Sequence, residues 1–180
     1  MTTPGSYESP ARSDDVVSVG ERRLIDHIRR RLPAPPASLV VGIGDDAAVA
    51  IVDRGAMQVL TTDAVVEGVH FDRRFSTTAD IGYKAVAVNV SDVAAMGGAP
   101  RLALLSLILP PTLLLTDVDG LLDGVLEAAA GTGVTLAGGN ITRSPGPLVV
   151  DVTVVGSVRA RRILTRSVSV YPFTACLEAV

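Results

Sequence analysis

The stretch from Thr77 to Gly98, TTADIGYKAVAVNVSDVAAMGG, decides the architecture of this chain. Thr77 and Asp80 have the spacing of a capping box, in which two side chains bond backbone amides at the start of a helix. Gly97-Gly98 is typical of the point at which a helix stops. The segment therefore predicts a helix that ends at Met96.

This helix is apolar almost all round, and one carboxylate lies within its apolar pattern. Steps of three and four residues connect one stripe, which we expect to be the core face: Ile81, Ala85, Val88, Asp92 and Ala95. Asp92 also lies near the helix C-terminus, where the macrodipole disfavours a negative charge by up to about 1 kcal/mol. Burial without a partner costs several kcal/mol more. Asp92 therefore needs a positive partner, either a divalent cation or Arg101 or Lys84.

Hydrophobic periodicity, together with Gly and Pro residues that end helices and strands, predicts the remaining elements. They are a helix over 20–31, two short strands within 39–52, a strand over 57–62, a strand over 102–109, a helix over 116–130, and strands over 134–137 and 148–158. This order predicts an α+β fold, a mixed β-sheet with helices packed on one face in two layers.

Composition limits the classes of function. Hydrophobic residues make up 48% of the 180 residues, which is enough for one core. A net charge of −3 and 3% aromatic residues argue against nucleic acid as a partner. The most apolar stretch, Leu102 to Leu115, is shorter than the roughly 20 residues of a membrane span. The first fifteen residues do not resemble a secretory signal, and the single cysteine, Cys176, excludes an intrachain disulfide. We therefore expect a cytoplasmic protein with no membrane or nucleic-acid partner.

Three further carboxylates stand out from the ordinary surface positions. Asp45 and Asp46 lie between two apolar strands, and Asp63 follows Thr61-Thr62 at a strand end. In isolation the first pair is typical of a hairpin turn and the second segment of a strand terminus. Taken together with Asp92, they form a set of oxygen ligands, which favours Mg²⁺ over Zn²⁺.

A double glycine, Gly138-Gly139, follows the buried strand over 134–137. Glycines let a backbone approach a ligand closely and point its N–H groups at an anion. Thr142, Arg143 and Ser144 then supply donors suited to phosphate oxygens. A tight strand-to-loop turn is the alternative interpretation of the glycine pair.

Taken in order, five segments resemble the thiamine-monophosphate kinase family, and the resemblance extends from about Gly20 to about Ser167. The segments are GIGDDAA (42–48), TTD (61–63), EGVHF (67–71), GYKAVAVNVSDVAAMG (82–97) and GGNITRSPGP (138–147). The wider superfamily includes aminoimidazole ribonucleotide synthetase, selenophosphate synthetase and a hydrogenase-maturation protein. The EGVHF segment favours the thiamine enzyme within it.

The resemblance implies transfer of the ATP γ-phosphoryl group to thiamine monophosphate, giving thiamine diphosphate and ADP, by a homodimer that pairs through its sheet. The implied Mg²⁺-binding positions are Asp46, Thr61, Thr62, Asp63 and Asp92. Gly139 and Arg166 match positions that contact ATP, and His70 matches a substrate-contacting position. Asn140 stands where the family usually has Asp. An amide oxygen can still ligate Mg²⁺, but it brings no charge.

The resemblance also implies a domain organisation. We expect residues 1–18 to be a disordered leader, 19–167 the N-terminal metal- and ATP-binding domain, and 168–180 an atypical tail. The family continues after the Leu-Thr-Arg-Ser segment into a second domain, which the tail does not resemble. We therefore expect this chain alone to phosphorylate thiamine monophosphate far more slowly than a full-length enzyme. Two alternatives stay open: a non-catalytic dimerisation or nucleotide-binding module, and another ATP-dependent enzyme of the superfamily.

Overall fold

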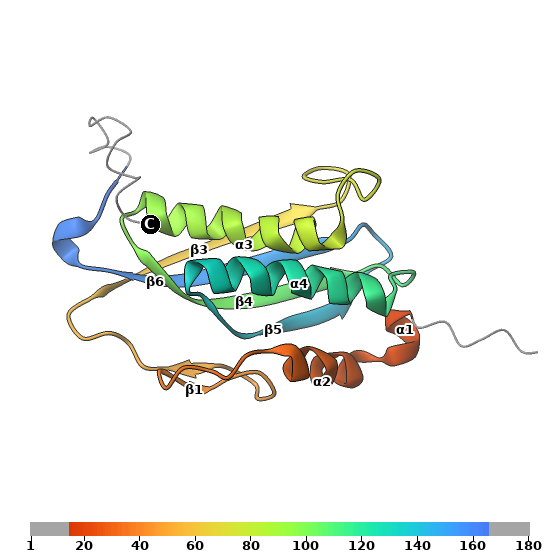
Figure 1. The fold of residues 1–180 in the computed structure, drawn as a ribbon, viewed down its shortest axis with the longest axis horizontal. Helices are drawn as coiled ribbons and strands as arrows, with labels where there is room; N and C mark the ends of the chain where they lie inside the picture. The colour runs from red at the N-terminus through yellow and green to blue at the C-terminus, as the bar shows by residue number, and fades with distance from the viewer. Residues whose placement is uncertain (1–14, 166–180) are drawn as a thin grey trace, which may run out of the picture.

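The computed structural model describes residues 15–165, and a four-stranded mixed sheet lies at the centre of the fold (Figure 1). The strand order is β3-β6-β4-β5. The strands are β3 (Met57–Val66), β4 (Ala99–Leu109), β5 (Thr135–Arg143) and β6 (Val149–Val158). β6 runs antiparallel to both of its neighbours, whereas β4 and β5 are parallel.

Two long helices, α3 (Thr78–Ala95) and α4 (Leu115–Thr132), lie side by side across one face of this sheet (Figure 1). The opposite face, called the open face below, has no helix packed across it within the described residues. Strand alternation matches this arrangement, because every second residue of β6 is buried beneath the helices. The predicted α+β fold with helices on one face of a mixed sheet is therefore confirmed.

The two helices approach each other until their backbones touch, and glycines make this possible. A Cβ built on Gly82 would lie 2.0 Å from the carbonyl oxygen of Leu121. A Cβ on Gly124 would lie 1.8 Å from the carbonyl oxygen of Ala79. No larger residue fits at either position without separating the helices.

The N-terminal elements lie along the β5 edge of the sheet (Figure 1). They are α1 (Val16–Val19), α2 (Glu21–Arg31) and a hairpin of β1 (Leu39–Val41) with β2 (Val49–Ala50). Ion pairs tie α2 to α4, since Asp119 accepts from His27 and from Arg31, each at 2.6 Å. A single 3₁₀ turn, η1 (Ala160–Arg162), follows β6.

Three sequence expectations need correction. Residues 15–18 were expected to belong to a disordered leader, yet Asp15 caps α1 by accepting from the Ser18 amide, and Val16 is buried. β3 continues past Thr62 to Val66, because it pairs with β6 along its whole length. β5 continues through Gly138-Gly139, since β4 pairs with it up to Arg143. The rest of the expected leader, residues 1–14, and the expected tail, residues 168–180, lie outside the described residues.

None of the helices in residues 15–165 is both long enough and apolar enough to cross a membrane.

Candidate functional site

A cleft of about 1130 Å³ runs along the β5 edge of the sheet. Its walls come from α2, from the turn between β1 and β2, and from β4 and β5, with Thr153 of β6 at one side. The acidic turn Gly42–Ala48 and the segment Gly138–Asn140 both line this cleft, although they are far apart in the sequence. The structure thus brings together two of the features that the sequence singled out.

The acidic turn is held in place by local contacts. Gly44 has a φ of 111°, a conformation that favours glycine, and Arg29 of α2 packs against it. The Asp46 amide donates a 2.9 Å hydrogen bond to Oδ1 of Asp45. Asp46 itself is exposed and takes part in none of the ion pairs among the described residues. The hairpin interpretation is confirmed, and the same hairpin brings the Asp46 carboxylate into the lining of the cleft.

Gly139 shows why one of the two glycines cannot be replaced. A Cβ at Gly139 would lie 1.8 Å from the carbonyl oxygen of Leu105 on the neighbouring strand. At Gly138 the nearest atom to an added Cβ is the Leu104 Cδ2 at 3.6 Å, an ordinary contact. The glycine at 139 therefore lets β5 lie against β4 at the point where the cleft wall is formed.

A second group of predicted residues lies on the helix-covered side of β3. Thr61 pairs with Val154 and Asp63 with Val152, and both valines are buried under the helices. The Thr61 hydroxyl donates a 3.0 Å hydrogen bond to Oδ2 of Asp92, near the end of α3. Thr61 and Asp92 are thus in contact, and Asp63 follows on the same side of the same strand.

The sheet separates the residues that were expected to share Mg²⁺. Asp46 lies in the cleft and Asp92 on the helix-covered side, whereas Thr62 pairs with Thr153 and Asn140 with Ser106 on the open face. Within residues 15–165, no three His, Cys, Asp or Glu side chains are grouped closely enough to hold a metal ion. The expected convergence of Asp46, Asp63 and Asp92 is therefore wrong for the single chain. The physical reason is that the turn carrying Asp46 lines the cleft, whereas Asp63 and Asp92 lie on the helix-covered side of the sheet; strand alternation separates Thr62 from Thr61 and Asp63.

The predicted core stripe of α3 is also wrong in its second half. Asp92 is exposed, and the polar residue buried in this helix is Asn89, at 0% exposure. The buried residues from the middle of α3 onward are Val86, Asn89 and Val93, so the core stripe lies one position, about 100° around the helix, away from Asp92. The two ion pairs considered for Asp92 are not formed either: Arg101 bonds Asp53 at 2.9 Å and Lys84 donates to the His70 carbonyl oxygen at 2.6 Å.

His70 lies on the exposed loop after β3 and does not line the cleft. Its Nδ1 accepts a 3.1 Å hydrogen bond from the Val66 amide, so the neutral ring carries its proton on Nε2. In the same loop, hydrogen bonds from the Arg74 side chain and amide lower the pKa of Asp72 to about 2. The loop is therefore braced by local bonds, and it leaves one edge of the imidazole ring available.

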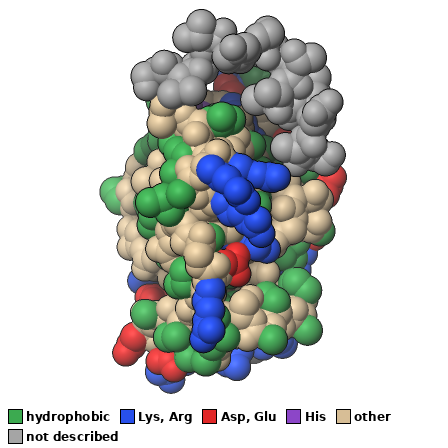
Figure 2. All heavy atoms as spheres, turned by 90° about the vertical axis from the view of Figure 1, so that its left-hand side faces the viewer, with side chains coloured by type: hydrophobic (Ala, Val, Ile, Leu, Met, Phe, Trp, Pro, Cys, Tyr) green, Lys and Arg blue, Asp and Glu red, His purple; other side chains and the backbone are tan. Residues whose placement is uncertain are grey.

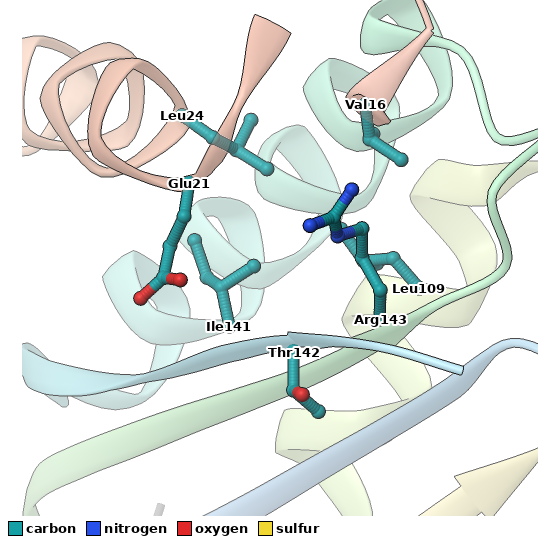
Figure 3. A pocket seen from close by; sticks show the side chains of 7 residues that line it. All are labelled: Val16, Glu21, Leu24, Leu109, Ile141, Thr142 and Arg143. Carbon is teal, nitrogen blue, oxygen red and sulfur yellow. The ribbon is translucent and has the colours of Figure 1, made fainter. Parts of the chain in front are cut away.

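A smaller pocket of about 300 Å³ lies between α1, α2 and the end of β5 (Figure 3). Ile141 and Arg143 point toward the helices, while Thr142 points to the other side of the strand (Figure 3). Thr142 and Arg143 were both expected to supply donors for phosphate oxygens. Alternation along β5 places them on opposite sides, so they cannot act together on one group.

Figure 2 looks onto the end of the molecule at which η1 follows β6, and Lys and Arg side chains run in a band down this face. The exposed arginines of this segment are Arg159, Arg161 and Arg162. Arg166, expected to contact ATP, lies outside the described residues.

One polar residue on the open face was missed from the sequence. The Thr62 hydroxyl donates to Oδ1 of Asp151 at 3.1 Å and lies 2.9 Å from the Thr153 hydroxyl. The sequence showed Asp151 only as one position in a half-exposed strand. The available signal was its residue type, because Asp is depleted in strands.

Comparison with known proteins identifies the family to which the residues of this site belong. The family model of AIR synthase related protein, N-terminal domain, matches residues 44–158. The thiamine-monophosphate kinase of Bacillus subtilis (strain 168) is 40% identical over 133 residues, 74% of this chain and 41% of that protein. The crystal structure of thiamine-monophosphate kinase from Stenotrophomonas maltophilia K279a has 38% identity and a TM-score of 0.69, over 79% of this chain and 44% of that chain.

A second similar structure is AaThiL complexed with AMPPCP and TMP. It has 36% identity and a TM-score of 0.57, over 83% of this chain and 45% of that chain. The chain spans about half or less of the length of the curated relatives that it matches. The matched residues include the acidic turn from Gly44, the β3 and α3 group, and Gly139. This chain belongs to the AIR synthase related proteins and carries the N-terminal domain of that family.

Proposed function

We propose that this chain serves an ATP- and Mg²⁺-dependent thiamine-monophosphate kinase, which transfers the ATP γ-phosphoryl group to the phosphate of thiamine monophosphate. The observation that carries the proposal is the cleft that Asp46, Gly139 and Asn140 all line. Similarity to the B. subtilis thiamine-monophosphate kinase and to AaThiL complexed with AMPPCP and TMP supports the choice of substrates. The cytoplasm is the compartment we propose for this reaction.

The residue types suit phosphoryl transfer. The acceptor phosphate is already ionised at neutral pH, so the reaction needs no general base and no nucleophilic side chain. The difficulty lies in bringing two polyanions into line. In the cleft, the glycine backbone at Gly139 leaves room for phosphate groups to approach, and the Asp46 and Asn140 oxygens are suited to a hard cation.

We propose Mg²⁺ ligands of two kinds. Asp46, Asn140 and Thr62 would hold metal on the side of the cleft and the open face, and Thr61, Asp63 and Asp92 would hold it on the helix-covered side of β3. The donor chemistry fits Mg²⁺, because all six residues offer oxygen atoms. Bound Mg²⁺ neutralises phosphate charge and orients the transferred group. Thr61 keeps the Asp92 carboxylate oriented through its 3.0 Å hydrogen bond.

His70 and Arg166 complete the proposed site. His70 offers its Nε2–H edge to the substrate, since Nδ1 is already engaged by the Val66 amide. Arg166 would contact ATP, because a guanidinium matches phosphate oxygens.

We also propose that the chain forms a homodimer through the open face of its sheet. Large apolar side chains stand on that side: Leu60 is 65% exposed and Leu104 40% exposed. Large exposed apolar side chains on a sheet face are typical of protein–protein contacts. A second copy of the same sheet would cover it.

The function is tested by following thiamine diphosphate formation from ATP and thiamine monophosphate. We expect product only when both substrates and Mg²⁺ are present. Asp46→Asn should lower the rate about a hundredfold, the effect of losing roughly 3 kcal/mol of transition-state stabilisation. Glu127→Gln, on the exposed side of α4, serves as the control and should leave the rate unchanged.

Other results of the same assay would contradict the proposal. Product formation in EDTA, or an Asp46→Asn rate equal to that of the parent, would reject the metal role of the cleft. ATP cleavage that does not require thiamine monophosphate would reject the proposed acceptor.

A further inference from the structure

The pocket between α1, α2 and the end of β5 is a second cavity, which the proposed function leaves without a role (Figure 3). Its volume is about 300 Å³. Four apolar side chains form most of its wall: Val16, Leu24, Leu109 and Ile141. The first three of these are buried, so the wall belongs to the packed core. A concave apolar surface with a few polar groups at its margin is typical of a site for a small ligand.

Two exposed side chains of opposite charge, Glu21 of α2 and Arg143 of β5, complete the lining. Figure 3 shows Arg143 pointing toward the helices, and Glu21 extending from α2 toward the strand. None of the ion pairs within residues 15–165 includes either of them. A guanidinium plane stacks on aromatic faces, and a carboxylate accepts hydrogen bonds from N–H groups. The pocket therefore suits a flat heterocycle with an amino group at its edge.

The pocket adjoins the cleft, because Glu21 and Ile141 line both. Arg143 comes four residues after Gly139 on β5, a distance of about 13 Å at the usual rise of a strand. This distance suits an extended nucleoside triphosphate whose phosphate groups lie at Gly139. One ligand can thus occupy the cleft with its phosphates and the pocket with its base.

The position of the pocket favours the nucleotide over the acceptor substrate. His70, the residue proposed to contact thiamine monophosphate, follows β3, and β3 and β5 are the two opposite edges of the four-stranded sheet. Three strand spacings, about 14 Å, separate these edges. The acceptor held at His70 therefore leaves the pocket at β5 to the phosphoryl donor.

We propose that this pocket holds the adenine base of ATP. Arg143 stacks its guanidinium group on one face of the ring, and the Glu21 carboxylate accepts a hydrogen bond from the exocyclic amine. The apolar wall shields the rest of the ring from water. The identity of the ligand rests on the proposed function, and the pocket adds the residues that bind its base. Arg143 thereby contacts the base and not the phosphate groups.

The test compares two ligands, because AMPPCP has a base and inorganic tripolyphosphate has none. Both are titrated into the purified chain with Mg²⁺ by calorimetry. We expect Arg143→Ala to weaken AMPPCP binding about tenfold, an effect typical of a lost stacking contact with a base, and to leave tripolyphosphate binding unchanged. Glu21→Gln should weaken AMPPCP binding about fivefold with the same selectivity.

Two control variants remove the same charges at exposed positions that line neither cavity. They are Arg30→Ala and Glu127→Gln, and each should bind both ligands like the parent. Circular dichroism confirms that every variant is folded. Unchanged AMPPCP binding in Arg143→Ala and Glu21→Gln would overturn the proposal.

Arg143→Lys separates stacking from charge. Lysine keeps the positive charge but has no planar group, so this variant should remain several-fold weaker than the parent toward AMPPCP. Full recovery in Arg143→Lys would show that the arginine acts only as a charge. Equal weakening of AMPPCP and tripolyphosphate in Arg143→Ala would show that it contacts phosphate. Either result would overturn the base pocket.

Adenosine distinguishes this inference from the proposed function, because it has no phosphate group to bind at the cleft. We expect the parent to give a saturation-transfer signal with adenosine in nuclear magnetic resonance, and Arg143→Ala to lose it. Failure of tripolyphosphate to bind with Mg²⁺ would reject the role of the cleft and leave the pocket standing. Failure of adenosine to bind the parent would reject the pocket and leave the cleft standing.

Discussion

Gly138 and Gly139 are neighbours in β5, yet an added methyl group meets different surroundings at each. At Gly139 it would overlap the Leu105 carbonyl oxygen, whereas at Gly138 it would make an ordinary contact. We predict that Gly139→Ala lowers the free energy of unfolding by about 3 kcal/mol, through overpacking against backbone. Gly138→Ala should change it by less than about 1 kcal/mol. Urea unfolding of both variants provides the measurement, and equal effects would contradict the close approach of β4 and β5.

At the same scale, the residues of the site show where sequence reasoning reaches its limit. The residue types of Thr61, Asp63 and Asp92 indicated that their hydroxyl and carboxylate oxygens belong to a common site. In the structure, the Thr61 hydroxyl donates a hydrogen bond to the Asp92 carboxylate. Which face each residue takes could not be read from the chain, because a shift of one position in a strand reverses it. Asp46 could be recognised as a turn residue, but its place in the same cleft as Gly139 depends on contacts far apart in sequence.

Among the elements, the packing of α3 on α4 gives a matched pair of tests. Gly124 and Gly131 both lie in α4, but only Gly124 touches the facing helix, where its added Cβ would be 1.8 Å from the Ala79 carbonyl oxygen. Gly124→Ala should destabilise the protein by about 3 kcal/mol. Gly131→Ala meets no atom within 4 Å and should stabilise it by about 0.5–1 kcal/mol through helix propensity. Thermal unfolding of the two variants distinguishes them, and destabilisation by both would show that α4 is held differently.

The capping box that begins α3 makes a pH-dependent contribution to stability. Hydrogen bonds from the Thr77 hydroxyl and amide lower the pKa of Asp80 below its ordinary value of 3.8. The unfolded chain therefore binds the proton more tightly than the folded one. The contribution is present above about pH 4 and is lost as the pH falls through the lowered pKa.

We predict that Asp80→Asn lowers the Tm at neutral pH and that its difference from the parent shrinks toward pH 2. Calorimetry across that range measures both. In a Thr77→Ala background the Asp80→Asn effect should become smaller, because the hydroxyl donor is lost while the backbone amide of residue 77 still donates to Asp80. A pH-independent difference between parent and Asp80→Asn would rule out the ionised cap.

At the scale of the whole molecule, the exposed apolar side chains on the open face predict self-association. We expect light scattering at micromolar concentration to give the mass of two chains. Leu60→Glu should shift the mass to one chain, because Leu60 pairs with Val155 on that face. Val69→Glu is the control, since Val69 is 74% exposed on the loop after β3 and should leave the dimer intact. A parent mass of one chain would reject the dimer.

The architecture was predictable because it follows from local patterns. The capping box at Thr77, the alternation in β6 and the apolar face of α4 each identified an element that the structure contains. The path of β5 through Gly138-Gly139 was not predictable, because pairing with β4 overrides the local preference of glycine for turns. The order of strands in the sheet likewise depends on pairings that no local pattern specifies.

We propose that the cleft lined by the acidic turn and Gly139 binds a nucleotide through metal. The direct test is a calorimetric titration of AMPPCP into the chain, with Mg²⁺ and with EDTA. The account predicts binding that requires Mg²⁺, becomes at least about tenfold weaker in Asp46→Asn and is unchanged in Glu127→Gln. Binding of equal strength in EDTA, or in Asp46→Asn, would contradict it.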